Sequence, residues 1–167
     1  MEQALKQAKN ALRADEVPVG AIVLDARTQV ILSSAYNQTI HLNDPTAHAE
    51  ILAIRKAGDK LRNYRLNNCL LVVTLEPCLM CLGAIVQARL QGIIFGAKDP
   101  KGGAIYSCCN YQRLTGLNHN FWVIDGVLAD QSASLLRHFF QTKRKIKERY
   151  RSGRNGGDSK SLCPSNN

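Results

Sequence analysis

Residues 69–81 read Cys-Leu-Leu-Val-Val-Thr-Leu-Glu-Pro-Cys-Leu-Met-Cys, and this stretch determines the expected fold. Its continuous apolar run over residues 69–73 predicts a strand that is buried on both faces of a sheet. Glu76-Pro77 then begins a helix over about residues 78–89, because proline is favoured at the start of a helix. A buried strand that leads directly into a helix is typical of an α/β protein.

The segments on either side extend this alternation. We expect a helix over residues 2–14, a hairpin of strands over 17–24 and 30–35, strands over 92–95 and 121–124, and a helix from 130 to about 150. Another helix should cover about residues 46–57, with Asp44 as N-cap, Pro45 at the first helical position and Gly58 at its end. Residues 96–120 are rich in loop-forming residues. This order predicts a three-layer α/β/α sandwich around a mixed sheet of about five strands.

Length and composition are those of one folded domain. With 167 residues, 45% of them hydrophobic and 21% charged, the chain can bury a core, and we expect a domain over residues 1–151 and a disordered tail over 152–167. No apolar run approaches the roughly 18 residues of a membrane span, and the first residues lack the apolar core of a signal peptide. We therefore expect a cytoplasmic protein without a membrane partner. In that reducing compartment, a Cys-x-x-Cys pair indicates a metal or redox site.

Positive charge is concentrated near the C-terminus. Residues 137–154 hold eight basic residues against one acidic residue, so this segment carries +7 of the chain's net +9. It is consistent with a solvated helix end or with a surface that binds a polyanion. A membrane surface is a third interpretation, but the apolar positions of the segment are needed for the core.

Two short segments carry chemistry. Thr46-Ala47-His48-Ala49-Glu50 and Pro77-Cys78-Leu79-Met80-Cys81 together contain His-x-Glu and Pro-Cys-x-x-Cys. Cys78 and Cys81 are three residues apart at a helix start, where both sulfurs emerge on one face and thiolates are favoured. One imidazole and two thiolates suit zinc, and three protein ligands leave a coordination position open for water. Glu50 is then the candidate for moving protons.

One geometric conflict remains in this interpretation. Residues two apart on an ideal helix face opposite directions, so His48 and Glu50 share a site only if His48 lies in a non-ideal first turn. Alone, Cys78 and Cys81 also fit a redox pair or two small buried side chains. A structural zinc site needs a fourth ligand, for which the candidates are His41, His119, Cys69, Cys108 and Cys109.

The His-x-Glu and Pro-Cys-x-x-Cys combination is the signature of zinc deaminases. With its flanking blocks, the chain resembles the bacterial tRNA-specific adenosine deaminases, whose fold is cytidine deaminase-like. These blocks are residues 16–21, Asn37, 44–51, 63–66, 74–81, 95–99, 118–119, 126–130 and 139–140. The resemblance implies a homodimer with one Zn²⁺ per subunit that converts the wobble adenosine of a tRNA anticodon stem-loop to inosine. It also implies that His48, Cys78 and Cys81 bind the metal and that Glu50 is catalytic.

The resemblance extends to substrate contacts. Asn37 matches a position that contacts the target base, although by sequence alone it is equally a turn residue after a strand, and Asp99 matches a position near the neighbouring nucleotide. The chain departs from the family at Ile105-Tyr106, where small residues are usual. For the RNA backbone we expect contacts from Lys101, Lys143, Arg144, Lys145, Lys147 and Arg149. The rival functions are a free-base or nucleotide deaminase, for guanine or a pyrimidine, and a non-catalytic zinc module that binds RNA.

Overall fold

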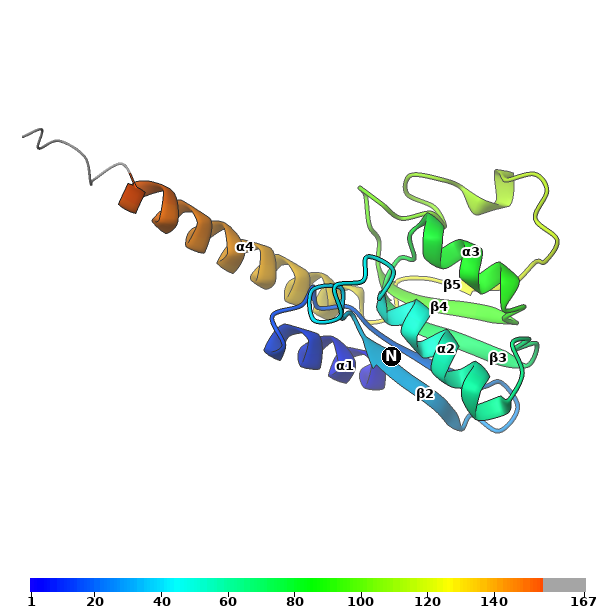
Figure 1. Cartoon of the computed structure of the whole chain (residues 1–167). Coiled ribbons are helices and arrows are strands. Elements are labelled where there is room, and N and C mark those ends of the chain that lie inside the picture. The colour runs from blue at the N-terminus through cyan, green and yellow to red at the C-terminus, as the bar shows by residue number, and fades with distance from the viewer. Residues whose placement is uncertain (155–167) are drawn as a thin grey trace, which may run out of the picture.

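The computed structural model of the chain, which describes residues 1–154, contains one mixed sheet and four α-helices (Figure 1). The helices are α1 (Glu2–Arg13), α2 (Ala49–Leu61), α3 (Leu79–Gln87) and α4 (Ala129–Arg154), with a short 3₁₀ helix η1 (Tyr111–Arg113). The strands are β1 (Gly20–Asp25), β2 (Ile31–Tyr36), β3 (Cys69–Leu75), β4 (Gly92–Ala97) and β5 (Trp122–Ile124). They are arranged in the order β2-β1-β3-β4-β5, with β1 antiparallel to both neighbours and β3, β4 and β5 parallel. The predicted mixed sheet of five strands is confirmed.

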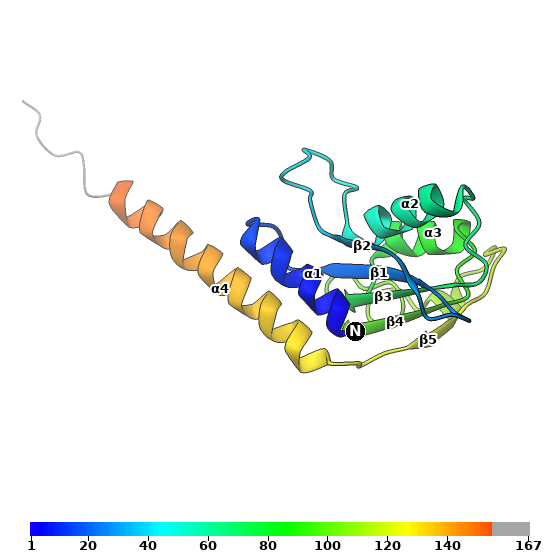
Figure 2. The same ribbon diagram turned by 90° about the horizontal axis from the view of Figure 1, so that it is seen from below.

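The helices cover the sheet on both faces. Figure 2 shows α2 and α3 together on one side of the strands, with α1 and α4 on the other. The side chains of the central strand follow this division, because Leu71 and Val73 pack in the core beneath α2 and α3 whereas Val72 packs with Ala4 of α1. The continuous apolar run that begins at Cys69 therefore fills two cores, and the predicted three-layer sandwich is confirmed.

The start of α2 differs from the prediction. The helix begins at Ala49 rather than near residue 46, and its N-cap is His48 instead of Asp44. Asp44 uses its carboxylate locally, since Oδ1 accepts hydrogen bonds from the N–H and the hydroxyl of Thr46, both at 2.7 Å. This side-chain turn competes with helix formation and holds the chain in a loop until His48.

The end of α2 was also wrongly predicted. The helix continues through Gly58 to Leu61 and ends at Arg62, which has a left-handed backbone conformation with φ of 50°. A glycine within a helix costs only about 1 kcal/mol relative to alanine, so the flanking residues can carry the helix past it.

The last helix extends beyond the sheet. α4 begins beside β4, and its second half projects away from the rest of the molecule in both views (Figures 1 and 2). It runs to Arg154, so residues 152–154 are helical although they were predicted to belong to a disordered tail over 152–167. The rest of that predicted tail, residues 155–167, lies outside the described residues. Within the described part of the chain, none of the helices combines the length and apolar character that a membrane crossing needs.

Candidate active site and metal centre

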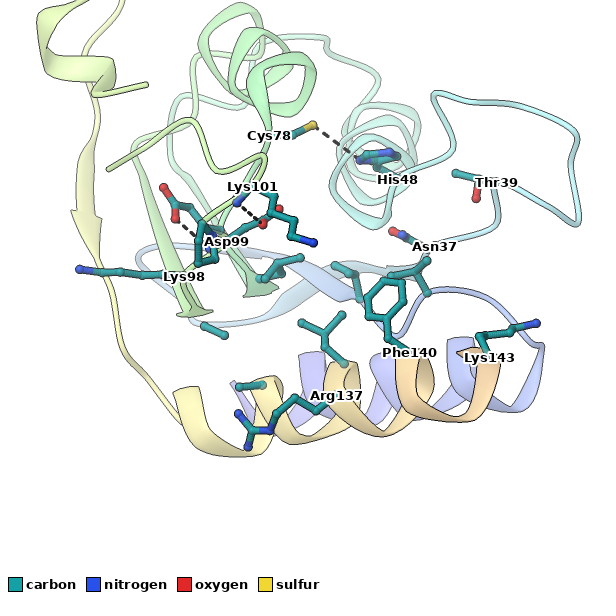
Figure 3. Close-up of a pocket in the computed structure, with 18 of the residues that line it drawn as sticks. Asn37, Thr39, His48, Cys78, Lys98, Asp99, Lys101, Arg137, Phe140 and Lys143 are labelled. Carbon is teal, nitrogen blue, oxygen red and sulfur yellow. Dashed lines mark hydrogen bonds between the residues drawn. The ribbon is translucent and has the colours of Figure 1, made fainter. Parts of the chain in front are cut away.

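Three side chains with metal-binding atoms converge where α2 and α3 begin. His48 is the N-cap of α2, Cys78 is the N-cap of α3, and Cys81 lies in the first turn of α3. The Nδ1 atom of His48 lies 3.7 Å from Sγ of Cys78 (Figure 3) and 3.6 Å from Sγ of Cys81. All three candidate ligand atoms are within 4.8 Å of one another.

This spacing fits a zinc ion. Bonds of about 2.3 Å to sulfur and 2.0–2.1 Å to nitrogen at tetrahedral angles separate the two donor atoms by about 3.6 Å. Among residues 1–154, the cluster that could hold a metal consists of these three residues. The structure therefore brings the predicted ligand set together.

None of the candidates for a fourth ligand joins this cluster among the described residues. His119 uses Nε2 in a 2.7 Å hydrogen bond with the carbonyl of Leu90, and Cys108 donates to the carbonyl of Pro100. Cys69 lies buried in β3. A three-ligand centre is typical of catalytic rather than structural zinc.

The conflict between His48 and Glu50 is resolved by the position of the helix start. His48 has extended backbone angles (φ −71°, ψ 151°), so the spacing rule for two helical residues does not apply to it. Glu50 lies in the first turn of α2 and is only 3% exposed, and it lines the same groove as His48 and Cys78. The carboxylate thus lies beside the candidate metal centre.

The polar groups of the centre perturb one another. Hydrogen bonds from Cys81 and His48 overcome the effect of burial and lower the pKa of the Cys78 thiol to about 4. The pKa of the Cys81 thiol is raised, because it donates to Cys78 and is buried. Burial also raises the pKa of Glu50. A low pKa of the Cys78 thiol favours the thiolate form that a metal ligand requires.

A groove of about 970 Å³ opens above this centre. One wall carries His48, Glu50 and Cys78, and the opposite wall is α4, from which Leu136, Phe140 and Lys147 line the groove. Figure 3 shows Phe140 pointing from α4 toward the side of the groove that carries Asn37 and His48. The long helix therefore forms part of the site, which its sequence did not indicate beyond its charge.

The two residues predicted to bind the substrate both line the groove. Asn37 is 6% exposed, and its Oδ1 accepts a 2.8 Å hydrogen bond from the N–H of Ala49, the first residue of α2. Asp99 follows β4, and its Oδ1 accepts from the N–H of Lys101 at 3.0 Å. Asn37 thus has a structural role at the helix start and still presents its side chain to the groove.

The six basic residues predicted to contact RNA divide into two sets. Four of them line the groove: Lys101, Lys143, Arg144 and Lys147. Lys143 also forms an ion pair with Asp15, with 2.6 Å between Nζ and Oδ2. Lys145 and Arg149 do not line it, because 3.6 residues per helical turn place them on another side of α4.

Several lining residues were missed by sequence reasoning. Arg137 and Phe140 of α4, Lys98 after β4 and Thr39 in the loop before α2 all line the groove. Phe140 is 48% exposed, which agrees with a surface role. Glu76, whose role the sequence left open, accepts hydrogen bonds from the loop that follows β4. Burial raises its pKa, but hydrogen bonds from that loop outweigh burial and lower it.

Comparisons with known proteins agree with this geometry. The family model of the cytidine and deoxycytidylate deaminase zinc-binding region matches residues 1–97. The tRNA-specific adenosine deaminase of Haemophilus influenzae is 43% identical over 148 residues, which cover 89% of this chain and 85% of that protein. Its counterpart in Bacillus subtilis is 39% identical over 148 residues, 89% of this chain and 91% of that protein.

Solved structures show the same relationship. One comes from studies of A-to-I editing by tRNA:A34 deaminases at the wobble position of transfer RNA; it has a TM-score of 0.78 and 43% identity over 81% of this chain and 97% of its own. A guanine deaminase from Nitrosomonas europaea has a TM-score of 0.73 and 26% identity, over 83% of this chain and 82% of its own.

Proposed function

This chain belongs to the tRNA-specific adenosine deaminases, within the cytidine and deoxycytidylate deaminase family, and from that premise we propose that it converts the wobble adenosine of a tRNA anticodon loop to inosine. The observation that carries the proposal is the combination of three metal ligands and a buried glutamate in a groove whose far wall is a basic helix. The reaction consumes water and releases ammonia.

His48, Cys78 and Cys81 hold one Zn²⁺ per subunit in this proposal. When bound, zinc lowers the pKa of a coordinated water from 15.7 toward about 7 and so supplies a nucleophile at neutral pH. Three ligands from two helix starts hold the donor atoms at the spacing that the ion needs.

Glu50 moves the protons. Its carboxylate takes a proton from the attacking water and delivers it to the ring nitrogen of adenine. It then takes the remaining proton of the hydroxyl that has added to the ring carbon and gives it to the amine, which leaves as ammonia. Its burial beside His48 keeps bulk water from exchanging with the proton during transfer.

The rims of the groove orient the base and its neighbour. Because Oδ1 of Asn37 already accepts from Ala49, the group that Asn37 offers to a base is its NH₂, a donor for a ring nitrogen. Asp99 lies across the groove and supplies an acceptor for the neighbouring nucleotide. Both assignments are proposals drawn from position and family resemblance.

The charge around the groove favours RNA over a free base. Lys101, Lys143, Arg144 and Lys147 line the same groove as the metal ligands, and a free base carries no phosphate for them to bind. Phe140 provides an exposed ring on which an unpaired base can stack. Lys145 and Arg149, which the sequence also predicted to contact RNA, lie on another side of α4 and are not part of the proposed contact set.

We also propose a cytoplasmic homodimer. Leu79 and Met80 lie between the two cysteine ligands and are 59% and 37% exposed, so a partner subunit that covers them would enclose the metal centre. The cytoplasmic location follows from the proposed tRNA substrate. Light scattering in solution tests the dimer, and a monomeric mass at micromolar concentration contradicts it.

A direct assay separates the candidate substrates. The zinc-loaded protein is incubated with an anticodon stem-loop that carries adenosine at the wobble position and, in parallel, with adenosine, guanine and cytidine. We expect inosine in the stem-loop alone. Turnover of guanine without inosine in RNA supports the free-base alternative, and tight RNA binding without any deamination supports the non-catalytic module.

A further inference from the structure

Two glutamates outside the metal centre lie buried beneath the loops that border the groove. Glu16 precedes β1 and is fully buried, and Glu76 follows β3 and is 2% exposed. A buried carboxylate is costly unless hydrogen bonds compensate it, so the partners of these two groups indicate their role.

Glu16 binds the loop between β2 and α2. Its Oε1 accepts hydrogen bonds from the N–H groups of Ile40 and His41, at 2.8 and 2.7 Å. Its Oε2 accepts from the hydroxyl of Thr39 at 3.2 Å, and Thr39 lines the groove. The same loop begins at Asn37 and ends at the metal ligand His48.

Glu76 binds the loop after β4 in the same manner. Its Oε1 accepts from three consecutive N–H groups, those of Ile105, Tyr106 and Ser107, at 3.1, 2.7 and 3.0 Å. Its Oε2 accepts from the N–H of Asp99 at 3.0 Å and from the hydroxyl of Ser107. Gly103 packs against this carboxylate so closely that a Cβ there would lie 2.3 Å from the carboxyl carbon.

We propose that Glu16 and Glu76 are positioning residues that hold the two rims of the groove in the RNA-binding conformation before the substrate arrives. The proposal rests on the function proposed above. Figure 3 shows Asn37 and Thr39 on one side of the groove and Asp99 and Lys101 on the other. A loop that is fixed in advance loses less conformational entropy on binding, which raises affinity.

The two carboxylates should respond differently to replacement by glutamine. In Glu76→Gln the NH₂ replaces one acceptor, and both oxygens of Glu76 face an N–H donor. The less costly orientation keeps three donors on the remaining oxygen and leaves the N–H of Asp99 without its acceptor. In Glu16→Gln one orientation of the amide keeps every hydrogen bond. Its oxygen accepts from the two N–H groups, and its NH₂ faces the hydroxyl of Thr39, which can rotate and accept.

The experiment compares Glu16→Ala, Glu16→Gln and Glu76→Gln with the wild-type protein, each loaded with zinc. Steady-state kinetics on the stem-loop give KM and kcat, and amide hydrogen exchange without RNA reports on the rims. We expect KM to rise about tenfold in Glu16→Ala and Glu76→Gln, with zinc content and kcat within about threefold of wild type. Amide exchange should accelerate at Ile40 and His41 in Glu16→Ala and at Asp99 in Glu76→Gln. Glu16→Gln should keep the KM of the wild-type protein.

Opposite results overturn the proposal. Faster exchange with unchanged KM shows that rim order does not affect binding, and a fall in kcat with loss of zinc shows a purely structural role. If Glu76→Gln fails to fold, Ser107→Ala removes one bond to Glu76 and should raise KM by a smaller factor. Because exchange is measured without substrate, the rims are tested even if the wild-type protein makes no inosine, which would count against the proposed function instead.

Discussion

Neutralising two cations on the groove side of α4 should weaken RNA binding in a salt-dependent manner. Arg144 and Lys147 are three residues apart and both line the groove, so they present their charges to the same strand of RNA. Lys145 and Arg149 carry the same charge on another side of the helix. The double variant Arg144→Gln/Lys147→Gln can therefore be compared with Lys145→Gln/Arg149→Gln, which has the same net charge.

The expected magnitude follows from counterion release. Each phosphate contact with single-stranded nucleic acid contributes about 0.7 to the slope of log K against log salt, so two lost contacts reduce the slope by about 1.4. If the variant and the wild-type protein bind equally at 1 M salt, the variant should bind about 65-fold more weakly than wild type at 50 mM salt and about 10-fold more weakly at 200 mM salt. The control pair should change affinity much less, because screening over about 10 Å weakens charges that do not touch RNA.

Fluorescence anisotropy of a labelled anticodon stem-loop measures both affinities across this salt range. A Glu50→Gln background prevents turnover during the titration. If both pairs weaken binding equally and with equal slopes, the helix acts through its total charge and the groove-side contacts are refuted.

Three further outcomes follow from the site and the packing. Glu50→Gln should keep zinc but slow inosine formation by about 10²–10⁴-fold, which is the usual contribution of acid–base catalysis. Metal analysis measures the zinc content and a product assay measures the rate; loss of zinc would contradict the catalytic role. Chelation should abolish activity and lower the melting temperature, and added zinc should restore both; full activity in chelator would exclude a metal mechanism. Gly20→Ala should reduce the free energy of unfolding by about 3 kcal/mol or more, the upper end of the usual cost of overpacking, because its Cβ would lie 2.1 Å from the carbonyl oxygen of Ala4. Gly83→Ala, where a Cβ meets nothing within 4 Å, is its matched control in denaturant titrations and should be neutral or stabilising.

Local patterns explain how much of the fold was predictable. The apolar run from Cys69 predicted a strand buried on two faces, and the spacing of Cys78 and Cys81 predicted two sulfurs on one side of a helix start. Both inferences need only a few neighbouring residues. The start of α2 was misplaced because Asp44 can cap a helix or bind the hydroxyl of Thr46, and the local sequence does not decide between them.

Contacts between distant segments were not predictable in this way. The N–H groups that Glu16 binds lie 24 and 25 residues farther along the chain, and those of Ile105 and Tyr106 lie 29 and 30 residues from Glu76. The charged Glu16 stands at the start of the apolar block of residues 16–21, but the sequence did not identify its hydrogen-bond partners. Similarly, Phe140 lines the groove because α4 packs against β4, and the local sequence does not indicate this contact.

The way the loop after β4 is fastened has a consequence for how this enzyme can diverge over evolution. Main-chain N–H groups of Ile105 and Tyr106 make the bonds to Glu76, and every residue type except proline carries such a group. A change of side chain at Tyr106, which is 36% exposed, can therefore leave the loop on its course, whereas Ile105 is fully buried in the core and is constrained by packing as well. Position 103 has no such freedom, since any side chain larger than hydrogen collides with the carboxylate. Inherited variation in this loop should accordingly accumulate at position 106 rather than at the buried position 105 or at the glycine.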